Sequence, residues 1–251
     1  MQARMPDEFY EIVKHFLPEQ DPPGCRGGRP LKSHRVVLGV IWFVEISGCR
    51  WKDIPPEMGC CGETARCRLR DWEKAGVWDA VHQELLRHLR KLGLLDPSVV
   101  IIDSKQTRAV GERDKTGPSP VDRWKKGSKF TLVVDRIEVP LVIQTAPSNR
   151  SDHDKLIAAV ESIPKIGGLP GRPKTHPDKL YADAGYDSDL HRDILRFMGI
   201  EPFIRRRRSQ HGSQLGKTDG SSNVRLAGSK DFGERGHATI EQTQQSMPLR
   251  H

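Results

Sequence analysis

Two acidic residues each follow a short apolar run, in a pattern that can support metal-dependent chemistry. Asp103 follows Ser98–Ile102, which contains four consecutive β-branched residues, and Asp183 follows Lys179–Ala182. Runs of this kind predict buried strands. If the two strands are neighbours, two carboxylates with nothing to neutralise them share one edge, and a divalent cation is their natural ligand. The alternative for Asp103 is a purely structural one, in which its side chain caps a turn.

Other acidic residues have simpler explanations in local structure. Glu63 stands at a predicted helix start and Asp135 in a predicted hairpin turn. Asp152 is a predicted helix cap, and Asp187 stands at the entry to a predicted helix. The sequence therefore selects Asp103 and Asp183 as the candidate catalytic and metal-binding residues.

The segment around these acids predicts a mixed sheet flanked by helices. After the first strand, the apolar patterns indicate a hairpin of strands at 130–134 and 139–145 and a helix at about 152–163. A strand ending at Asp183, a helix through 190–198 and a short strand at 202–204 follow. This β-β-β-α-β-α order is that of a ribonuclease H-like core.

The preceding segment, residues 5–93, reads as an all-helical, helix-turn-helix-like domain. Helices are predicted at about 7–17, from the Ser33 cap to Gly48, at 63–74 and from Trp78 to Gly93. In the third helix Arg66 and Arg70 share one face, and Cys67 and Trp72 are expected to turn away from it. An arginine-lined helix after a short turn suits the DNA major groove, although many surface helices carry two arginines.

Composition excludes several classes of protein. The chain has 251 residues, 35% of them hydrophobic, and a mean hydropathy of −0.60. It has no run of 18 apolar residues and no signal-peptide core at its start, so we expect a cytoplasmic protein without membrane association. The five cysteines form no C-x-x-C pair, which favours reduced thiols over disulfides or a zinc site.

Basic residues are in excess and clustered, which points to a polyanionic partner. The formal net charge is +8 and the pI is about 9.4. Any one cluster is more often a solvated face, but here the clusters flank the paired acids, so double-stranded DNA becomes the leading partner. The candidate DNA-binding residues are Arg66, Arg70, Arg123, Lys125, Lys126, Lys129, Arg205, Arg206, Arg207 and Arg208.

A set of motifs in fixed order resembles the bacterial insertion-sequence DDE transposases of the insertion-sequence-five type. The resemblance covers about residues 5–218. The motifs are Ile102-Asp103-Ser104 with Arg108-Ala109, Lys115 to Arg123, Gly127-Ser128-Lys129, Asn149-Arg150 with Asp152, Tyr181 to Asp187, and His211 to Gly216. Glu138 departs from the family, which usually has glycine in this hairpin, so a distorted turn is expected there.

The resemblance implies that Asp103 and Asp183 are the first two acids of a catalytic triad that binds Mg²⁺ or Mn²⁺. It implies DNA cleavage at the terminal inverted repeats of an element, with water as nucleophile. It also implies transfer to target DNA, with the freed 3′-hydroxyl as nucleophile. A homo-oligomer on DNA is compatible with this activity.

The third acid of the triad is missing from the reading frame. Within the family a helix containing Arg-Trp-Val-Val-Glu-Arg-Thr follows, whereas residues 219–251 are polar and lack helical periodicity, which predicts a disordered tail. Reading the codons of Asp219 to Arg225 one base out of frame, with wobble bases free, can restore Trp-Val-Val-Glu-Arg-Thr. The tail thus resembles an out-of-frame translation after a one-base loss near Thr218, which leaves 96–218 as an incomplete catalytic domain.

Two functional hypotheses follow from these observations. In one, the chain is a transposase with DNA-binding and strand-transfer architecture. In the other, it binds the terminal repeats without cutting them and competes with intact transposase. The missing in-frame acid favours the second. Replacement of that acid by Glu234 or Glu241 has little support, because neither lies on a helix with an apolar stripe. A further alternative, an unrelated ribonuclease H-like nuclease, would leave the helical domain unexplained.

Overall fold

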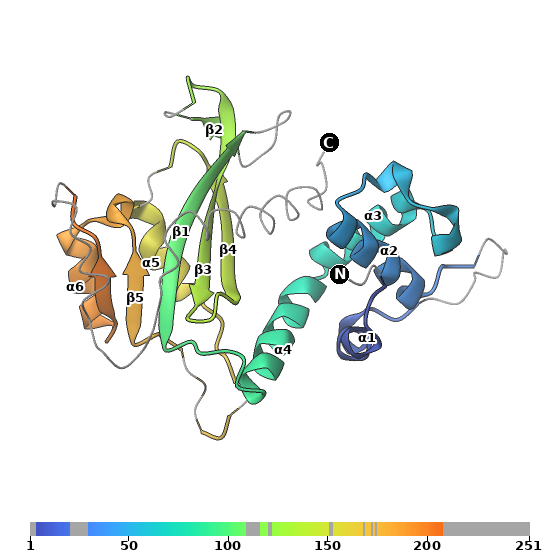
Figure 1. The fold of residues 1–251 in the computed structure, drawn as a ribbon, viewed down its shortest axis with the longest axis horizontal. Helices are drawn as coiled ribbons and strands as arrows, with labels where there is room; N and C mark the ends of the chain where they lie inside the picture. Colours follow the sequence, from blue (N-terminus) through green and yellow to red (C-terminus); the bar gives the residue numbers. More distant parts are fainter. Residues whose placement is uncertain are drawn as a thin grey trace. The chain divides into compact units, whose positions relative to one another are not determined.

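The computed structural model describes residues 4–20, 30–108, 116–119, 122–150, 153–167, 169–171, 173 and 175–207. These residues form two compact units, which divide between Leu85 and Leu86 (Figure 1). The division falls within a helix, upstream of the Gly93 boundary that the sequence suggests. Among the described helices, none is both long and apolar enough to cross a bilayer.

The first unit is helical, as the sequence predicts. Its main helices are α1 (Asp7–Val13), which a 3-10 turn at Lys14–Phe16 extends, α2 (His34–Ser47) and α3 (Gly62–Lys74). The Ser33 hydroxyl accepts a hydrogen bond from the Val36 amide at the start of α2. Gly48 ends the helix in the left-handed conformation, with φ of 66°. Both predicted ends of this helix are confirmed.

The core of the first unit comes from the apolar stripes of these helices. Val13, Val37, Val40, Ala65 and Trp72 are all at most 1% exposed and belong to one cluster. The next helix, α4 (Val77–Lys91), contributes residues to both units. Its Val77 and Val81 belong to the first core, whereas its Leu86 belongs to the second.

The second unit is built on a mixed sheet. Its strands are β1 (Val99–Arg108), β2 (Gly117–Pro118), β3 (Lys126–Asp135), β4 (Pro140–Pro147), β5 (Lys179–Ala182) and β6 (Glu201–Ile204). The five longer strands lie in the order β4-β3-β1-β5-β6, with β2 on the end of β3. The pairs β1–β3 and β3–β4 are antiparallel, whereas β1–β5 and β5–β6 are parallel. The mixed sheet and the order of strands and helices along the chain are those of the predicted ribonuclease H-like core.

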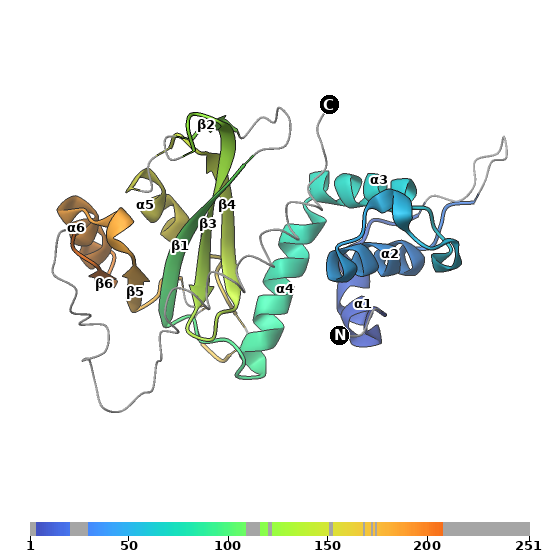
Figure 2. The same ribbon diagram turned by 45° about the horizontal axis from the view of Figure 1, so that its top comes forward.

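Two helices bury one face of this sheet. They are α5 (His153–Glu161) and α6 (Asp189–Phe197), which lie beside the strands in both ribbon views (Figures 1 and 2). Val100 and Leu180 occupy paired positions on the neighbouring strands β1 and β5, and both are fully buried. They share a core with Leu156 of α5 and Leu195 of α6. Because this face is buried, the apolar side chains along each strand must point toward it, and the side chains between them point to the opposite face.

The turn between β3 and β4 is held by a buried acid. The Asp135 carboxylate accepts hydrogen bonds from the amides of Asp96, Ile137 and Val139 at 2.7–2.9 Å. Burial raises the pKa of Asp135. Glu138 lies in the left-handed region with φ of 70°, a conformation that favours glycine, so a non-glycine residue is strained at this position.

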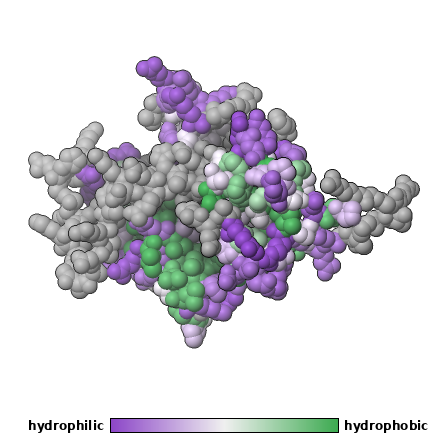
Figure 3. Space-filling model, turned by 45° about the vertical axis from the view of Figure 1, so that its right-hand side comes forward, coloured by the Kyte–Doolittle hydropathy of each residue, from purple (hydrophilic) through white to green (hydrophobic). Residues whose placement is uncertain are grey.

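The surface of the chain is uneven in polarity. On the face shown in Figure 3, apolar residues gather in a patch at the lower centre and in a second area towards the upper right, with hydrophilic residues beside both. Exposed large apolar side chains in the described residues include Leu92, Leu94 and Ile137, each more than half exposed. Single exposed apolar residues are normal in globular proteins, so they identify no site by themselves.

Replacing Glu138 by glycine should stabilise the second unit. A non-glycine residue in the left-handed region costs about 1–2 kcal/mol, and glycine gives back about 0.5–1 kcal/mol through its greater freedom in the unfolded chain. We therefore expect Glu138→Gly to raise the free energy of unfolding by roughly 0.5–1 kcal/mol in urea titrations. Ile137→Gly, in the same turn but without positive φ, should lower it. Equal effects of the two substitutions would contradict the strain argument.

Candidate active site

The register of two parallel strands brings Asp103 and Asp183 to adjacent positions. Ile102 of β1 pairs with Ala182 of β5, and Asp103 and Asp183 directly follow these two residues in the sequence. Parallel strands lie about 4.8 Å apart, so their next residues are neighbours. Both acids also follow the carboxyl ends of the paired segments, where open α/β sheets bind their ligands. The predicted juxtaposition of these two residues is therefore present.

Side-chain alternation places both acids on the sheet face opposite α5 and α6. Ile102 is buried among the core residues of the helix-covered face, so the side chain of Asp103 points to the other face. Tyr181, two residues before Asp183, points the same way and stacks on Phe203 of β6 with ring centroids 4.8 Å apart. Asp103 is half-buried and Asp183 is exposed.

Asp103 differs from the prediction in one respect, because it does not end its strand. β1 continues to Arg108, and residues 103–108 remain paired with β3. The strand that ends here is β5, whose chain turns into a 3-10 helix at Ala184–Tyr186. The antiparallel partner β3 satisfies the backbone of Asp103 on one side, so the acid occupies a rigid strand with one open edge.

Asp183 is fixed by the turn that follows it. Its Oδ1 accepts a hydrogen bond from the Gly185 amide at 2.8 Å and caps the 3-10 helix. A Cβ on Gly185 would lie 2.9 Å from that same oxygen, closer than Cβ atoms approach in proteins. On β1, Oδ1 of Asp103 accepts from the Ser104 amide at 2.7 Å. Each acid therefore has one oxygen oriented by its own backbone.

A buried arginine and a second arginine brace the turn after Asp183. Arg192 of α6 is 6% exposed, and it lies 2.6 Å from the Asp187 carboxylate and 3.1 Å from the Ile204 carbonyl. Arg207 donates through its side chain to the carbonyls of Ala184 and Gly185 at 3.0 and 3.1 Å. The Arg207 amide and the Arg192 guanidinium lower the pKa of Asp187. Asp187 is thus a structural acid, as predicted.

Arg207 was predicted to bind DNA, but its guanidinium is already engaged with the Asp183 turn. Arg205 and Arg206 are exposed, and Arg206 lies 3.3 Å from Asp189 on the surface. Arg208 lies outside the described residues. Arg207 is exposed as well, so it differs from Arg205 and Arg206 in its contacts with the turn and not in its burial.

The predicted basic residues of the β3 region also divide into two groups. Arg123, Lys125 and Lys126 are exposed. Lys129 is only 5% exposed, and its Nζ donates to the Arg150 carbonyl at 3.1 Å. Residues 127–135 of β3 are all buried, so Lys129 does not present its charge on the surface and we leave it out of the proposed DNA-binding set.

In the first unit, Arg66 and Arg70 lie on one face of α3, as predicted, but Cys67 lies on that face too. Arg66 pairs with Glu63 through two hydrogen bonds of 2.8 and 3.0 Å, which raise the pKa of Arg66 and lower that of Glu63. Cys67 was expected to turn away, yet its Sγ lies 3.8 Å from Arg70. Positions 63, 66, 67 and 70 share one side of a helix. Trp72 is buried on the opposite side, as predicted.

A third acid does not join the pair within the described part of the chain. Among those residues there is no group of three histidine, cysteine or acidic side chains that could hold a metal ion. Glu63 and Asp135 are held by the local contacts described above. Asp152, Glu234 and Glu241 lie outside the described residues.

Several contributors to this site escape sequence reasoning. Gly185 and Arg192 act through contacts with Asp183 and Asp187 that only the folded turn reveals. Arg108 forms a bidentate pair with Asp122, with one contact of 2.8 Å. Arg108 and Asp122 both lie within the sequence motifs named above, and this location is the feature of the sequence that could have identified them.

Two family models together match most of the chain. Residues 5–82 match "Putative transposase of IS4/5 family", and residues 94–250 match "Transposase DDE domain". The first match coincides with the helical unit and the second includes the whole mixed sheet.

Two relatives come from Burkholderia cepacia. A "Putative transposase for insertion sequence element IS402" is 40% identical over 158 residues, which are 63% of this chain and 67% of the relative. An "Insertion element IS402 uncharacterized 16.2 kDa protein" is 43% identical over 116 residues, 45% of this chain and 79% of the relative.

Solved structures of Mos1 transposase complexes are more distant. The Mos1 strand transfer complex is 13% identical with a TM-score of 0.26, over 74% of this chain and 62% of that chain. A Mos1 mariner paired end complex with Mn is 12% identical with a TM-score of 0.28, over 79% and 66%. The chain thus spans about two thirds of these proteins. The fold assignment rests on the strand order described above and not on these scores.

Gly185→Ala should disturb the acid pair without unfolding the unit. The added methyl group would displace the Asp183 carboxylate by steric contact at Oδ1, so we expect Mn²⁺ affinity to fall about tenfold, as for lost orienting contacts at metal sites. Gly167→Ala is the matched control, because a Cβ there meets no atom within 4 Å. Mn²⁺ titration by calorimetry measures both variants. Unchanged affinity in Gly185→Ala would show that this turn does not position the carboxylate.

Proposed function

The chain belongs to the transposase DDE domain family of insertion-sequence elements, and on that premise we propose that it binds the DNA ends of its element but cannot complete strand cleavage. Membership in the insertion-sequence transposases follows from the matched family model and the relatives. DNA binding, metal dependence and the catalytic defect are our proposals.

The observation that carries the proposal is the pair of carboxylates at the β1–β5 edge. Asp103 and Asp183 follow paired residues of neighbouring parallel strands and share one face of the sheet. Carboxylate oxygens are the ligands that Mg²⁺ and Mn²⁺ prefer, and the solvent-facing position of Asp183 leaves room for one. When bound, such a cation would stabilise charge that develops on phosphate oxygens.

These two acids have distinct tasks in the proposed site. Asp103 lies on a rigid strand and defines a fixed point for the cation. Asp183 lies on the turn braced by Arg192 and Arg207, and its orientation depends on Gly185. Preorganised ligands of this kind avoid reorganisation when DNA arrives.

The proposed defect comes from the number of acids. Two carboxylates offer too few fixed oxygens to hold two cations in the geometry that in-line displacement requires. Within the described residues no further acid completes the set. The family's third acid falls in the segment after Thr218, where the reading frame shift replaces it.

DNA binding is proposed to use exposed basic side chains of the second unit and two partly buried arginines of the first. In the second unit these are Arg123, Lys125, Lys126, Arg205 and Arg206. In the first unit Arg70 and Arg66 share a face of α3, although Arg66 must exchange its contact with Glu63 for one with DNA. Binding should weaken steeply with salt, since each neutralised phosphate releases counterions.

A chain that binds without cutting would act as a competitor of intact transposase. Both units match their family models, over residues 5–82 and 94–250, and the favouring observation is that the described part of the catalytic unit brings together two acids and no third. The proposed biochemical role is therefore occupation of terminal inverted repeats.

The decisive comparison is between the 251-residue chain and a version with one base inserted at codon 218. We expect the frame-restored protein to nick its terminal repeats in Mg²⁺ or Mn²⁺ and the 251-residue chain to remain near background, while both bind the DNA in filter assays. Asp183→Asn in the restored protein is the control for cleavage at this site. Equal cleavage by the two chains would refute the missing-acid argument.

A further inference from the structure

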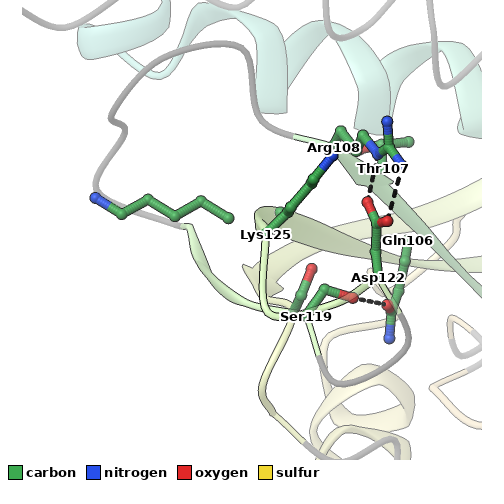
Figure 4. Close-up of a pocket in the computed structure, with 9 residues that line it drawn as sticks. Gln106, Thr107, Arg108, Ser119, Asp122 and Lys125 are labelled. Atoms are coloured by element: carbon green, nitrogen blue, oxygen red, sulfur yellow. Dashed lines mark hydrogen bonds and ion pairs between the residues drawn. The ribbon is translucent and has the colours of Figure 1, made fainter.

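We propose that a cavity at the Arg108–Gly127 end of the paired strands β1 and β3 binds one phosphate group of the DNA backbone, with Ser148 as a buried hydrogen-bond donor. This inference rests on the proposed DNA-binding function and adds a specific subsite to it. The cavity has a volume of about 290 Å³ and lies between the end of β1, the turn before β3 and the residue after β4 (Figure 4).

Ser148 supplies the observation that points to a ligand. It lines the cavity and is 2% exposed, yet its Oγ finds no hydrogen-bond partner among the described residues. Its backbone amide is satisfied, because it donates to the Gly127 carbonyl at 3.2 Å. Buried hydroxyl groups nearly always have partners, so an unpartnered one on a residue that lines a cavity indicates a missing acceptor.

A glycine makes the approach of Ser148 possible. A Cβ on Gly127 would lie 2.7 Å from the Ser148 Oγ and 2.8 Å from the Thr107 carbonyl oxygen. A larger residue at this position would therefore push Ser148 away and fill part of the cavity floor. The glycine in this motif is explained by close packing, since its φ is not positive.

The charge of the lining selects an anion. Lys125 and Lys126 contribute two exposed ammonium groups. The one acid of the lining, Asp122, is neutralised by the bidentate contact with Arg108, which Figure 4 shows as dashed lines. The hydrogen bond from Arg108 lowers the pKa of Asp122, with a smaller effect from Lys125. The lining thus keeps a net positive charge.

The turn that presents Lys125 is held in a strained conformation. Arg123 and Trp124 have φ of 46° and 62°, which is uncommon for residues other than glycine. Ser119 fixes this turn: its amide donates to the Lys125 carbonyl at 2.9 Å, and its carbonyl accepts from the Trp124 amide at 3.0 Å. Strain that surrounding contacts enforce is typical of ligand-binding segments.

The distance to the acid pair suits a single bound strand. The cavity begins at Gln106 and ends at Arg108, three to five residues beyond Asp103 on β1. At 3.3 Å per residue this is roughly 10–17 Å. A DNA strand rises 3.4 Å per nucleotide, so the phosphate in the cavity would lie roughly three to five nucleotides from the one at the acids.

The test compares Ser148→Ala and Lys125→Ala in the full chain with duplex DNA of the terminal repeat. Ser148→Ala should lose at least about tenfold in affinity, because a hydrogen bond to a charged group is lost. Its dependence on salt should stay the same, since no charge is removed. Lys125→Ala should lose affinity and also reduce the salt slope by about one.

Stability separates this role from a structural one. Ser148→Ala removes a hydroxyl without a partner, so its urea midpoint should equal or exceed that of the wild type. Ser162→Ala, whose Oγ donates to the Ala159 carbonyl at 2.8 Å, and Lys165→Ala, an exposed lysine, are the controls and should keep full DNA affinity. A Ser148→Ala variant that is less stable, or that binds DNA as the wild type does, overturns the proposal.

The source of the phosphate is tested with inorganic phosphate and a mononucleotide as separate ligands. We expect duplex DNA to bind far more tightly than either, and high phosphate concentrations to compete with DNA in the wild type but less in Ser148→Ala. Tighter binding of the mononucleotide would contradict a DNA backbone subsite. If the wild type binds no DNA at all, the proposed function fails. In that case, binding of inorganic phosphate that is weaker in Ser148→Ala than in the wild type would still support the cavity assignment, and equal phosphate binding by the two would contradict it.

Discussion

The parallel register between β1 and β5 is the constraint on which the candidate site depends. Pairing that ends at Ile102 and Ala182 makes the next two residues neighbours, and burial of Ile102 against the helices turns both aspartates to the opposite face. A slip of one residue would send one carboxylate into the core, at a high cost for an unpaired charge. The apolar packing of Val100, Leu180, Leu156 and Leu195 therefore sets the geometry of the acids as much as their own contacts do.

Electrostatic contacts then restrict the turn that carries the second acid. Arg192 is nearly buried between Asp187 and the Ile204 carbonyl, and Arg207 closes the turn through two backbone carbonyls. Removing one partner of such a buried pair is costly, because the remaining charge has no solvent to compensate it. The position of Asp183 is thus coupled to α6 and to the chain after β6. That coupling links the open, solvent-facing acid to the rigid core.

Much of this arrangement could be predicted from local patterns, and the rest depended on contacts between distant residues. The apolar runs before Asp103 and Asp183, the Ser33 cap and the Gly48 end are signals in neighbouring residues, and each gave a correct element. Continuation of β1 beyond Asp103 was missed because its residues are polar there and gain strand structure only by pairing with β3. Charge alone predicts DNA contacts for Lys129 and Arg207, whereas the burial of Lys129 and the backbone partners of Arg207 arise only in the folded sheet and turn.

The central claim is that Asp103 and Asp183 act as one cation site of low affinity, and a double-mutant cycle on Mn²⁺ binding tests it most directly. Calorimetric titration of the wild type, Asp103→Asn, Asp183→Asn and the double variant measures whether the two residues contribute to the same site. The account predicts weak binding in the wild type, loss of binding in either single variant, and no further loss in the double variant. Tight stoichiometric binding that survives Asp183→Asn would contradict it.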